Sequence, residues 1–202
     1  MNKYETDFEA FCQRGGHNAE ELLRVNSLVQ GDAFLGGGAI RRVLMGMPLD
    51  SDFDYFFKSK DHFEVWEANL LRNNKGLKKT RETTHHCQYE GVVGDSSIPV
   101  VIQAIMFRFY DSTWDVLDSF DYTITQFVLS GSKLYTTTES LWDLGRKKLV
   151  LHKVTYPVAT MRRMLKYTNQ GFTACGGCMQ DLFTMTLGNT EALAQMDITY
   201  VD

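Results

Sequence analysis

One stretch, residues 33–57, limits the folds open to this chain more than any other. Residues 33–35 (AFL) are apolar and run into three glycines at 36–38, which permit a sharp turn because glycine accepts positive φ angles. Residues 39–47 then carry apolar side chains at helical spacing, and a glycine and a proline end that helix. Residues 52–57 (DFDYFF) alternate acidic and aromatic side chains before a final phenylalanine, as a half-buried strand would. The stretch predicts a strand, a glycine turn, a short helix and an acidic strand.

The alternation in the acidic strand brings two carboxylates together. Side chains two apart on a strand point to the same face, so Asp52 and Asp54 share one face and Phe53 and Tyr55 the other. Carboxylates held that close repel unless one is protonated or a cation lies between them. Mg²⁺ and Mn²⁺ prefer oxygen ligands, and a helix that begins at glycines offers amide groups to phosphates. The pattern therefore predicts metal-dependent nucleotide chemistry.

The same residues resemble the head motif of a known family. Residues 37–48 (GGAIRRVLMGMP) and 52–54 (DFD) are similar to the Gly-Gly-x-Val-Arg-Asp, Leu-Gly-x-x-Pro and Asp-x-Asp motifs of the poly(A) polymerase and tRNA nucleotidyltransferase family, within the polymerase-β-like nucleotidyltransferase superfamily. The spacing differs by one residue, and Arg42 stands where the family usually has Asp. The resemblance implies an α+β nucleotidyltransferase fold, a mixed β-sheet flanked by helices. It implies a catalytic head over residues 1–153 and a short helical neck over 154–202.

The resemblance also implies roles for individual residues. Asp52 and Asp54 would be the catalytic residues and would hold two Mg²⁺ (or Mn²⁺) ions, which activate the attacking hydroxyl and neutralise the leaving pyrophosphate. Gly37 and Gly38 would cradle the triphosphate of a nucleoside triphosphate such as ATP, and Arg41 would add a fixed positive charge. The implied reaction is nucleotidyl transfer.

A second, weaker match lies at residues 121–128 (DYTITQFV). They resemble the family motif Arg-Arg-Asp-Phe-Thr-Ile-Asn-Ala, which lies by the nucleotide sugar and triphosphate, and Asp121 and Thr123 match it. Phe120 stands in place of the preceding Arg and Thr125 in place of the Asn, so part of the expected triphosphate and ribose contact is missing or comes from elsewhere. One face of an ordinary strand is the alternative interpretation of this segment.

A third position departs from the family in charge. Residues 99–107 (PVVIQAIMF) are apolar enough for a central strand, on which the family commonly carries a third carboxylate near the metal. Gln103 stands there instead, and an amide brings no charge. The resemblance leaves Asp50, Asp121 or water to cover the deficit.

The start of the neck supplies a basic helix. Residues 156–167 (YPVATMRRMLKY) are similar to the family's Asp-Pro-Leu-Arg-x-Leu-Arg helix, and a proline suits the first helical turn. Arg162 and Arg163 would then reach toward a phosphate of the nucleotide. The alternative is a solvated helix face.

Four cysteines leave two interpretations open. Cys12, Cys87, Cys175 and Cys178 are expected to be free thiols in a cytosolic chain. The last two, spaced Cys-Gly-Gly-Cys, have the spacing of a zinc knuckle or a redox site, but the chain has no second Cys-x-x-Cys and no spacing rule joins the pair to the His-His-Cys run at 85–87. The other interpretation is a pair of buried thiols beside a flexible Gly-Gly link.

Composition bounds the class of protein. With 202 residues, 44% of them hydrophobic, the chain can bury one core. No apolar run approaches the ~20 residues that cross a bilayer, and the N-terminus has no apolar signal region, which predicts a cytoplasmic protein without a membrane partner. The formal net charge of −4 speaks against a surface built to hold long nucleic acids. Basic clusters after residue 71 and in the neck keep RNA contact open.

Three functions fit these observations. The first is nucleotide addition to an RNA 3′ end, such as that of a tRNA-like acceptor. The second is nucleotidylation of a protein or small molecule, which the acidic balance favours. The third is a non-catalytic nucleotide-binding module, which Gln103 and Phe120 favour.

The remaining elements are predicted from periodicity. Apolar stripes predict helices, and runs rich in β-branched and aromatic residues predict strands. The expected helices cover residues 3–13, 17–29, 61–71, 112–117 and 179–187, and the expected strands cover 81–91 and 121–128.

Overall fold

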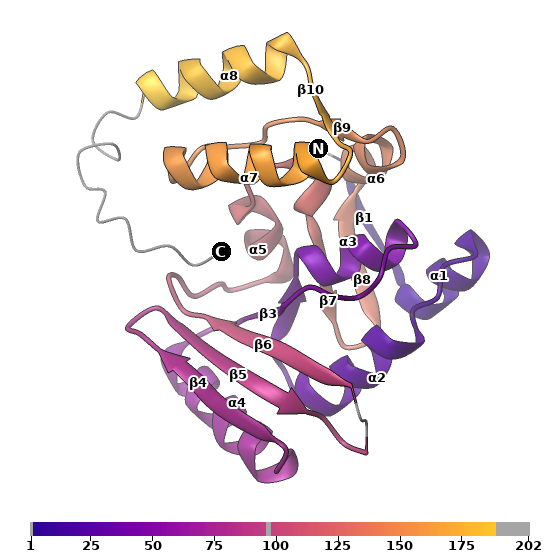
Figure 1. Cartoon of the computed structure of the whole chain (residues 1–202), viewed down its shortest axis with the longest axis vertical. Coiled ribbons are helices and arrows are strands. Elements are labelled where there is room, and N and C mark those ends of the chain that lie inside the picture. The colour runs from indigo at the N-terminus through magenta and orange to yellow at the C-terminus, as the bar shows by residue number, and fades with distance from the viewer. Residues whose placement is uncertain (1, 96–97, 189–202) are drawn as a thin grey trace.

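The structure is a computed structural model, and it describes residues 2–95 and 98–188 (Figure 1). Its helices are α1 (Phe8–Gly15), α2 (Glu20–Val29), α3 (Gly38–Leu44), α4 (Lys60–Asn73), α5 (Thr113–Ser119), α6 (Thr138–Gly145), α7 (Pro157–Asn169) and α8 (Gly176–Leu187), with a 3-10 turn η1 (Thr123–Thr125). Its strands are β1 (Lys3–Asp7), β2 (Phe34–Gly36), β3 (Phe53–Phe56), β4 (Leu77–Glu82), β5 (His86–Val92), β6 (Pro99–Ile105), β7 (Phe127–Ser130), β8 (Lys133–Thr137), β9 (Lys148–Leu149) and β10 (Thr173–Ala174).

One eight-stranded sheet forms the centre of the molecule. Its strand order is β1-β8-β7-β2-β3-β6-β5-β4. The neighbours β3 and β6 are parallel, and the other adjacent pairs are antiparallel. This mixed sheet with flanking helices confirms the predicted α+β class and the predicted strand, glycine turn, helix and acidic strand at its middle.

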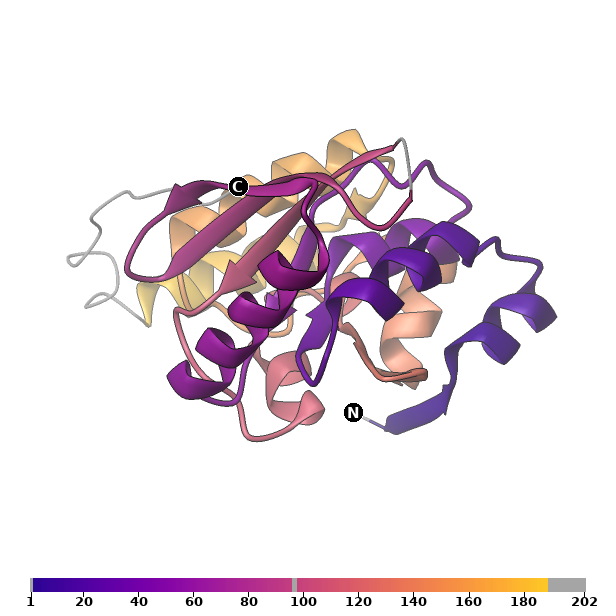
Figure 2. The ribbon, with the colours of Figure 1, turned by 90° about the horizontal axis from the view of Figure 1, so that it is seen from below.

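The core lies on the face of the sheet that α4 covers. Figure 2 shows α4 along one face of β4, β5 and β6. Phe53, Tyr55 and Phe57 alternate onto that face and are buried. The Trp66 ring of α4 lies 4.9 Å from the ring of Phe57 and 5.7 Å from that of Tyr55. Because these aromatics face α4, the intervening acidic residues face the opposite side.

The N-terminal prediction was wrong in part. Residues 3–7 were expected to begin a helix, but they form β1, an edge strand paired antiparallel with β8. The helix α1 starts only at Phe8, where the Asp7 side chain accepts a hydrogen bond of 2.9 Å from the Ala10 amide. The backbone hydrogen bonds of residues 3–7 are made to β8, which lies far away in the sequence. The local pattern of apolar residues therefore does not indicate this strand.

Two other predictions needed correction. The strand expected over 81–91 is a hairpin of β4 and β5, because residues 83–85 turn and the Thr83 amide donates to the His86 carbonyl. The strand expected over 121–128 opens with the 3-10 turn η1, and β7 begins at Phe127. The helices expected over 17–29, 61–71, 112–117 and 179–187 are present as α2, α4, α5 and α8, with boundaries shifted by up to three residues.

The C-terminal helices α7 and α8 lie side by side at one end of the molecule (Figure 1). Strand β10, between them, pairs in parallel with β9, and the Tyr122 hydroxyl donates 2.9 Å to the Thr160 carbonyl of α7. Among the helices of residues 2–95 and 98–188, none combines the length and apolar character that a membrane crossing requires. The expected neck element at residues 156–167 is therefore present as α7 and is tied to the sheet.

Candidate active site

Two carboxylates lie at the centre of the sheet on the face away from α4. Asp54 lies within β3 and Asp52 just before it, and both are partly buried. The neighbouring strand β6 places Gln103 directly beside Asp54. The Gln103 amide donates a hydrogen bond of 2.6 Å to Oδ2 of Asp52. The predicted shared face of Asp52 and Asp54 is thus present, and Gln103 acts as a donor to it.

Burial dominates the electrostatics of the pair. Burial and then the charge of Asp52 raise the pKa of Asp54 to about 7. Burial also raises the pKa of Asp52, and Glu90 on β5 adds to that rise, whereas Lys166 and the Gln103 hydrogen bond oppose it. A pKa near neutrality in a central carboxylate is a mark of a functional site.

Basic groups reach this pair from α7. Lys166 lowers the pKa of both aspartates, and Arg163 lowers that of Asp54. These two residues are three apart on the helix and so share one face. Arg162, which the sequence indicated, is exposed on the same helix, and its role in nucleotide binding stays a prediction. Arg163, which the resemblance indicated together with Arg162, thus lies near Asp54, and Lys166 of the same basic helix joins it.

The glycine turn approaches the acidic pair closely. Gly37 has φ of +79°, and a Cβ at this position would lie 3.6 Å from Oδ2 of Asp54. The Gly37 amide already donates to the Phe127 carbonyl at 3.0 Å, so this residue supplies space and a turn rather than a free donor. Gly38 opens α3 beside Ser51, whose buried hydroxyl has no hydrogen-bond partner.

Arg41 is buried between α3 and the C-terminal helices. Its guanidinium lies 4.5 Å from the centre of the Tyr167 ring and 5.7 Å from that of Phe172. One nitrogen, Nη2, donates 2.9 Å to Gln170, while Nε and Nη1 are buried without a partner. Arg41 is thus a buried cation stacked on aromatic rings, and its predicted contact with a triphosphate stays a prediction.

Asp121 is placed by an ion pair with the same helix. Its buried carboxylate pairs with Arg163 of α7. Phe120, which stands in place of the family's Arg, packs its ring edge-on to Phe56 at 5.8 Å. The ring also lies 3.8 Å from the Cβ position of Gly37. The resemblance implied that Asp121 lies beside the nucleotide. In the structure, the Asp121 carboxylate pairs with Arg163, whose guanidinium is close enough to Asp54 to lower its pKa.

Neither Asp50 nor Asp121 supplies a third carboxylate beside Asp52 and Asp54. Asp50 binds Arg42 at 2.5 Å, and Asp121 binds Arg163. Within the described part of the chain, no group of three or more His, Cys, Asp and Glu side chains is arranged to hold a metal ion. Two close carboxylates nevertheless fit Mg²⁺, because this ion usually takes one or two protein carboxylates and completes its shell with phosphates and water.

A buried histidine lies next to this site. His86 of β5 is fully buried, and neither ring nitrogen has a hydrogen-bond partner of full geometry. Burial lowers its pKa, and the nearby Gln103 opposes that effect. The lowered pKa favours the neutral imidazole, which lies near Gln103 on the neighbouring strand. No local pattern placed His86 near Gln103, because the pairing of β5 with β6 is a tertiary feature.

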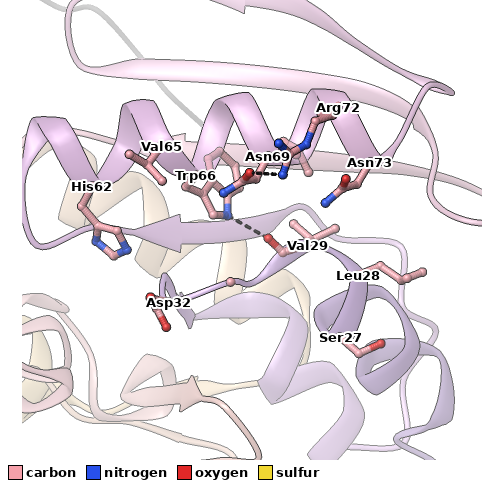
Figure 3. A pocket seen from close by; sticks show the side chains of 12 residues that line it. Ser27, Leu28, Val29, Asp32, His62, Val65, Trp66, Asn69, Arg72 and Asn73 are labelled. Carbon is pink, nitrogen blue, oxygen red and sulfur yellow. Dashed lines mark hydrogen bonds between the residues drawn. The ribbon is translucent and has the colours of Figure 1, made fainter.

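A cavity lies away from the acidic pair. It measures about 410 Å³ and lies between the end of α2 and α4 (Figure 3). Trp66 closes its floor by donating 2.8 Å to the Val29 carbonyl, and Asp32 is the one carboxylate among its lining residues. It shares no lining residue with the acidic pair.

Comparison of sequences decides the family of the chain. The sequence model of the Gabija anti-defense 2 family matches residues 3–147, which is more than half of the 202 residues. The chain belongs to the Gabija anti-defense 2 family. The matched range contains the glycine turn, both aspartates and Gln103, and it ends before α7. A search of curated proteins found no match.

Solved structures show which fold this family member has. A CCA-adding enzyme complexed with ATP superposes with a TM-score of 0.66 at 14% identity over 95% of this chain and 48% of that one. The Thermotoga maritima CCA-adding enzyme complexed with tRNA gives 0.61 at 14% identity, over 91% and 46%. The Bacillus stearothermophilus enzyme in complex with CTP gives 0.54 at 17% identity, over 89% and 45%. The chain spans a little under half the length of these enzymes, and the likeness shows the nucleotidyltransferase fold.

A substitution at Gln103 tests the site of this Gabija anti-defense 2 family member as an anionic centre. Gln103→Glu is expected to lower the thermal stability of the metal-free protein, since a third carboxylate would face Asp52 and Asp54 at a cost of about 1–3 kcal/mol. Mn²⁺ or Mg²⁺ should restore most of that loss. Thermal unfolding with chelator and with millimolar Mn²⁺ measures both effects.

Gln103→Met is the matched control, because it removes the hydrogen bond to Asp52 without adding charge. Its stability should fall modestly and respond to Mn²⁺ no more than wild type does. An equal response of the two variants would mean that position 103 does not face a cation site.

Proposed function

We propose that this protein is a metal-dependent nucleotidyltransferase that moves a nucleoside monophosphate from a nucleoside triphosphate to an acceptor hydroxyl. The observation that carries the proposal is the pair Asp52 and Asp54, held beside a glycine turn at the centre of a nucleotidyltransferase fold, where burial and the charge of Asp52 raise the pKa of Asp54 to about 7. Such a pair is costly to the fold when both members are ionised, and a bound cation would offset that cost.

The acidic pair would hold the Mg²⁺ or Mn²⁺. When bound, the ion lowers the pKa of the attacking hydroxyl and neutralises charge on the phosphates. Gln103 fixes the orientation of Asp52 by donating to Oδ2, which leaves the other oxygen of that carboxylate to face the ion. Arg163 and Lys166 add a positive field, which opposes the rise in the pKa of Asp54 and favours a triphosphate nearby.

The glycine turn and α3 would receive the triphosphate. Gly37 leaves the space beside Asp54 that a side chain would fill, and Ser51 offers a hydroxyl without another partner. Arg41 would act from beneath α7 as a fixed charge. Asp121 and Arg162 would contribute through α7, Asp121 by holding Arg163 and Arg162 by contact with phosphate.

An RNA 3′ end is the first acceptor that we propose. Its support is the fold, which is that of CCA-adding enzymes, one of them solved in complex with tRNA, and the basic residues of α7 beside the acidic pair. The hydroxyl at a 3′ end is a weak nucleophile, so it depends on activation by the ion.

A protein or small molecule is the second acceptor. The formal net charge of −4 favours it, because long nucleic acids are held mainly through basic surfaces. The description of the family as Gabija anti-defense favours it as well, since modification of a defence component would be a direct way to oppose defence.

Transfer of an α-labelled nucleotide tests both acceptors. The full chain is incubated with each α-labelled nucleoside triphosphate, Mg²⁺ or Mn²⁺, total RNA and total protein, in parallel with Asp52→Ala/Asp54→Ala. We expect label in one macromolecular fraction or in a small-molecule product, and at least a 10²-fold lower yield with the double variant. Asp50→Ala is the matched control, because Asp50 is exposed and pairs with Arg42.

The fraction that carries the label names the acceptor class. Label that persists in the double variant, or dependence on Asp50 equal to that on the pair, would overturn the assignment of Asp52 and Asp54. Absence of label from RNA, protein and small molecules together with absence of Mg²⁺-dependent nucleotide binding would overturn the enzyme proposal in favour of a non-catalytic module.

A further inference from the structure

A cysteine pair opens the last helix of the described chain. Cys175 is the N-cap residue of α8, with an extended backbone at φ −85° and ψ 167°, and Cys178 follows in the first turn. The Cys175 side chain is exposed, whereas Cys178 is 4% exposed. Residues three apart within one helical turn lie within the ~4.4–6.8 Å Cα separation that a disulfide spans. The pair therefore combines an accessible thiol with a protected one at bonding range.

The exposed sulfur lies over the first turn of the helix. Sγ of Cys175 is 3.7 Å from the Cβ position of Gly177, so it sits against the backbone of that turn. The amide of Cys178 lowers the pKa of Cys175 most, and the amide of Gly177 and the charge of Lys148 add to the effect. These amides act as dipoles, since no full capping hydrogen bond to the sulfur forms. A helix N-terminus thus favours the thiolate of Cys175.

The second sulfur has the opposite surroundings. Burial raises the pKa of Cys178, and the negative charge of Cys175 raises it further. Its thiol lies near the Leu151 backbone amide in the layer beneath α8. The protonated thiol of Cys178 is therefore favoured, and its burial protects it from reagents in solution.

The other two cysteines are a natural comparison. Cys12 and Cys87 are each 1% exposed, and burial raises the pKa of both thiols. Neither combines exposure with a lowered pKa. The described residues also contain no group of three or more side chains suited to a metal at Cys175 and Cys178, so the zinc interpretation of the spacing lacks its further ligands.

We propose that Cys175 and Cys178 form a thiol–disulfide exchange pair, in which Cys175 attacks and Cys178 resolves. The oxidant is a disulfide of a low-molecular-weight thiol or of a protein. The Cys175 thiolate attacks one sulfur of that disulfide, forms a mixed disulfide and releases one thiolate. Cys178 loses its proton to solvent and attacks Sγ of Cys175, which releases the second thiolate and closes the Cys175–Cys178 bond. Two electrons pass from the pair to the disulfide, which leaves as two thiols.

Reaction of the reduced full chain with oxidised glutathione tests the pair. Samples are quenched in acid at intervals, remaining thiols are alkylated, and each cysteine is assigned by peptide mass. Wild type is expected to gain the Cys175–Cys178 disulfide, with Cys12 and Cys87 unreacted. Cys178→Ser should accumulate a stable mixed disulfide at Cys175, and Cys175→Ser should leave Cys178 reduced.

A second measurement tests whether the reactivity of Cys175 comes from its place at the start of α8 or only from its exposure to solvent. The rate of Cys175 alkylation is followed against pH in the full chain and in a peptide of residues 173–180. The full chain should react severalfold faster below pH 8, with its half-maximal rate at lower pH than the peptide. The same profile for chain and peptide, reaction of Cys178 in Cys175→Ser, or protection of the pair by bound zinc would each overturn the proposal.

Discussion

Asp54→Asn is expected to abolish nucleotidyl transfer and, at the same time, to stabilise the metal-free fold. Transfer should fall by about 10²–10³-fold or more, because asparagine keeps the shape of the side chain but cannot bind the ion as an anion. Stability should rise by about 1–3 kcal/mol at pH 8, since the substitution removes a partly buried charge that Asp52 repels. Chemical denaturation with chelator present measures the second effect.

The pH dependence of folding stability determines whether Asp54→Asn stabilises or destabilises the protein. The pKa of Asp54 is raised from 3.8 to about 7, so the folded state binds the proton more strongly than the unfolded state. The wild type therefore loses stability as pH rises from about 4 to about 7, and Asp54→Asn does not. The variant should match wild type near pH 4 and exceed it at pH 8. Mg²⁺ should stabilise only the wild type, and a variant that is less stable than wild type at pH 8 would show that Asp54 serves the fold rather than the reaction.

Arg163→Met is expected to be the most destabilising change on α7. It would leave the Asp121 carboxylate, whose side chain is 4% exposed, without its ion-pair partner. Removing one member of a buried pair costs about 3–5 kcal/mol, and because the Arg163 side chain is 43% exposed we expect about 2–4 kcal/mol. Equilibrium denaturation measures the loss. The pKa of Asp54 should also rise further, which would move the pH profile of transfer upward.

Arg162→Met is the matched control for stability, since Arg162 is the preceding residue and is exposed. It should cost less than about 1 kcal/mol. The double variant Asp121→Asn/Arg163→Met should recover most of the lost stability, because it removes both charges. Equal losses from Arg162→Met and Arg163→Met would show that the ion pair does not hold α7 to the sheet.

The strand, turn, helix and acidic strand of the site were predictable because each depends on local chemistry. Glycines at 36–38 permit the turn, and the alternation around Asp52 and Asp54 fixes which face each side chain takes. The fold class followed from the same residues, and the solved structures confirm it. The family itself did not follow, since the motif is shared by the larger superfamily and carries no information on an anti-defense role.

The misses come from pairings that join distant segments. Strand β1 depends on β8, and residues 3–7 have no alternation strong enough to announce it. The resemblance indicated both Arg162 and Arg163, and it is the pairing of Arg163 with Asp121, a contact across 42 residues, that no local pattern reveals. His86 comes near Gln103 because β5 and β6 are adjacent. Local sequence patterns do not indicate such partners, because these residues come together only in the folded sheet.

The buried guanidinium of Arg41 limits how far this protein can be treated as modular. Its contacts, the Tyr167 and Phe172 rings and Gln170, all come from the C-terminal helical segment, 129 residues away at Gln170. A chain cut at the predicted head boundary, or one whose C-terminal segment is exchanged for that of another protein, would leave this cation beside a surface without the rings that cover it. The predicted head and the C-terminal segment are therefore joined by a buried contact, and we expect an exchange of either one to need the matching partner residues of the other.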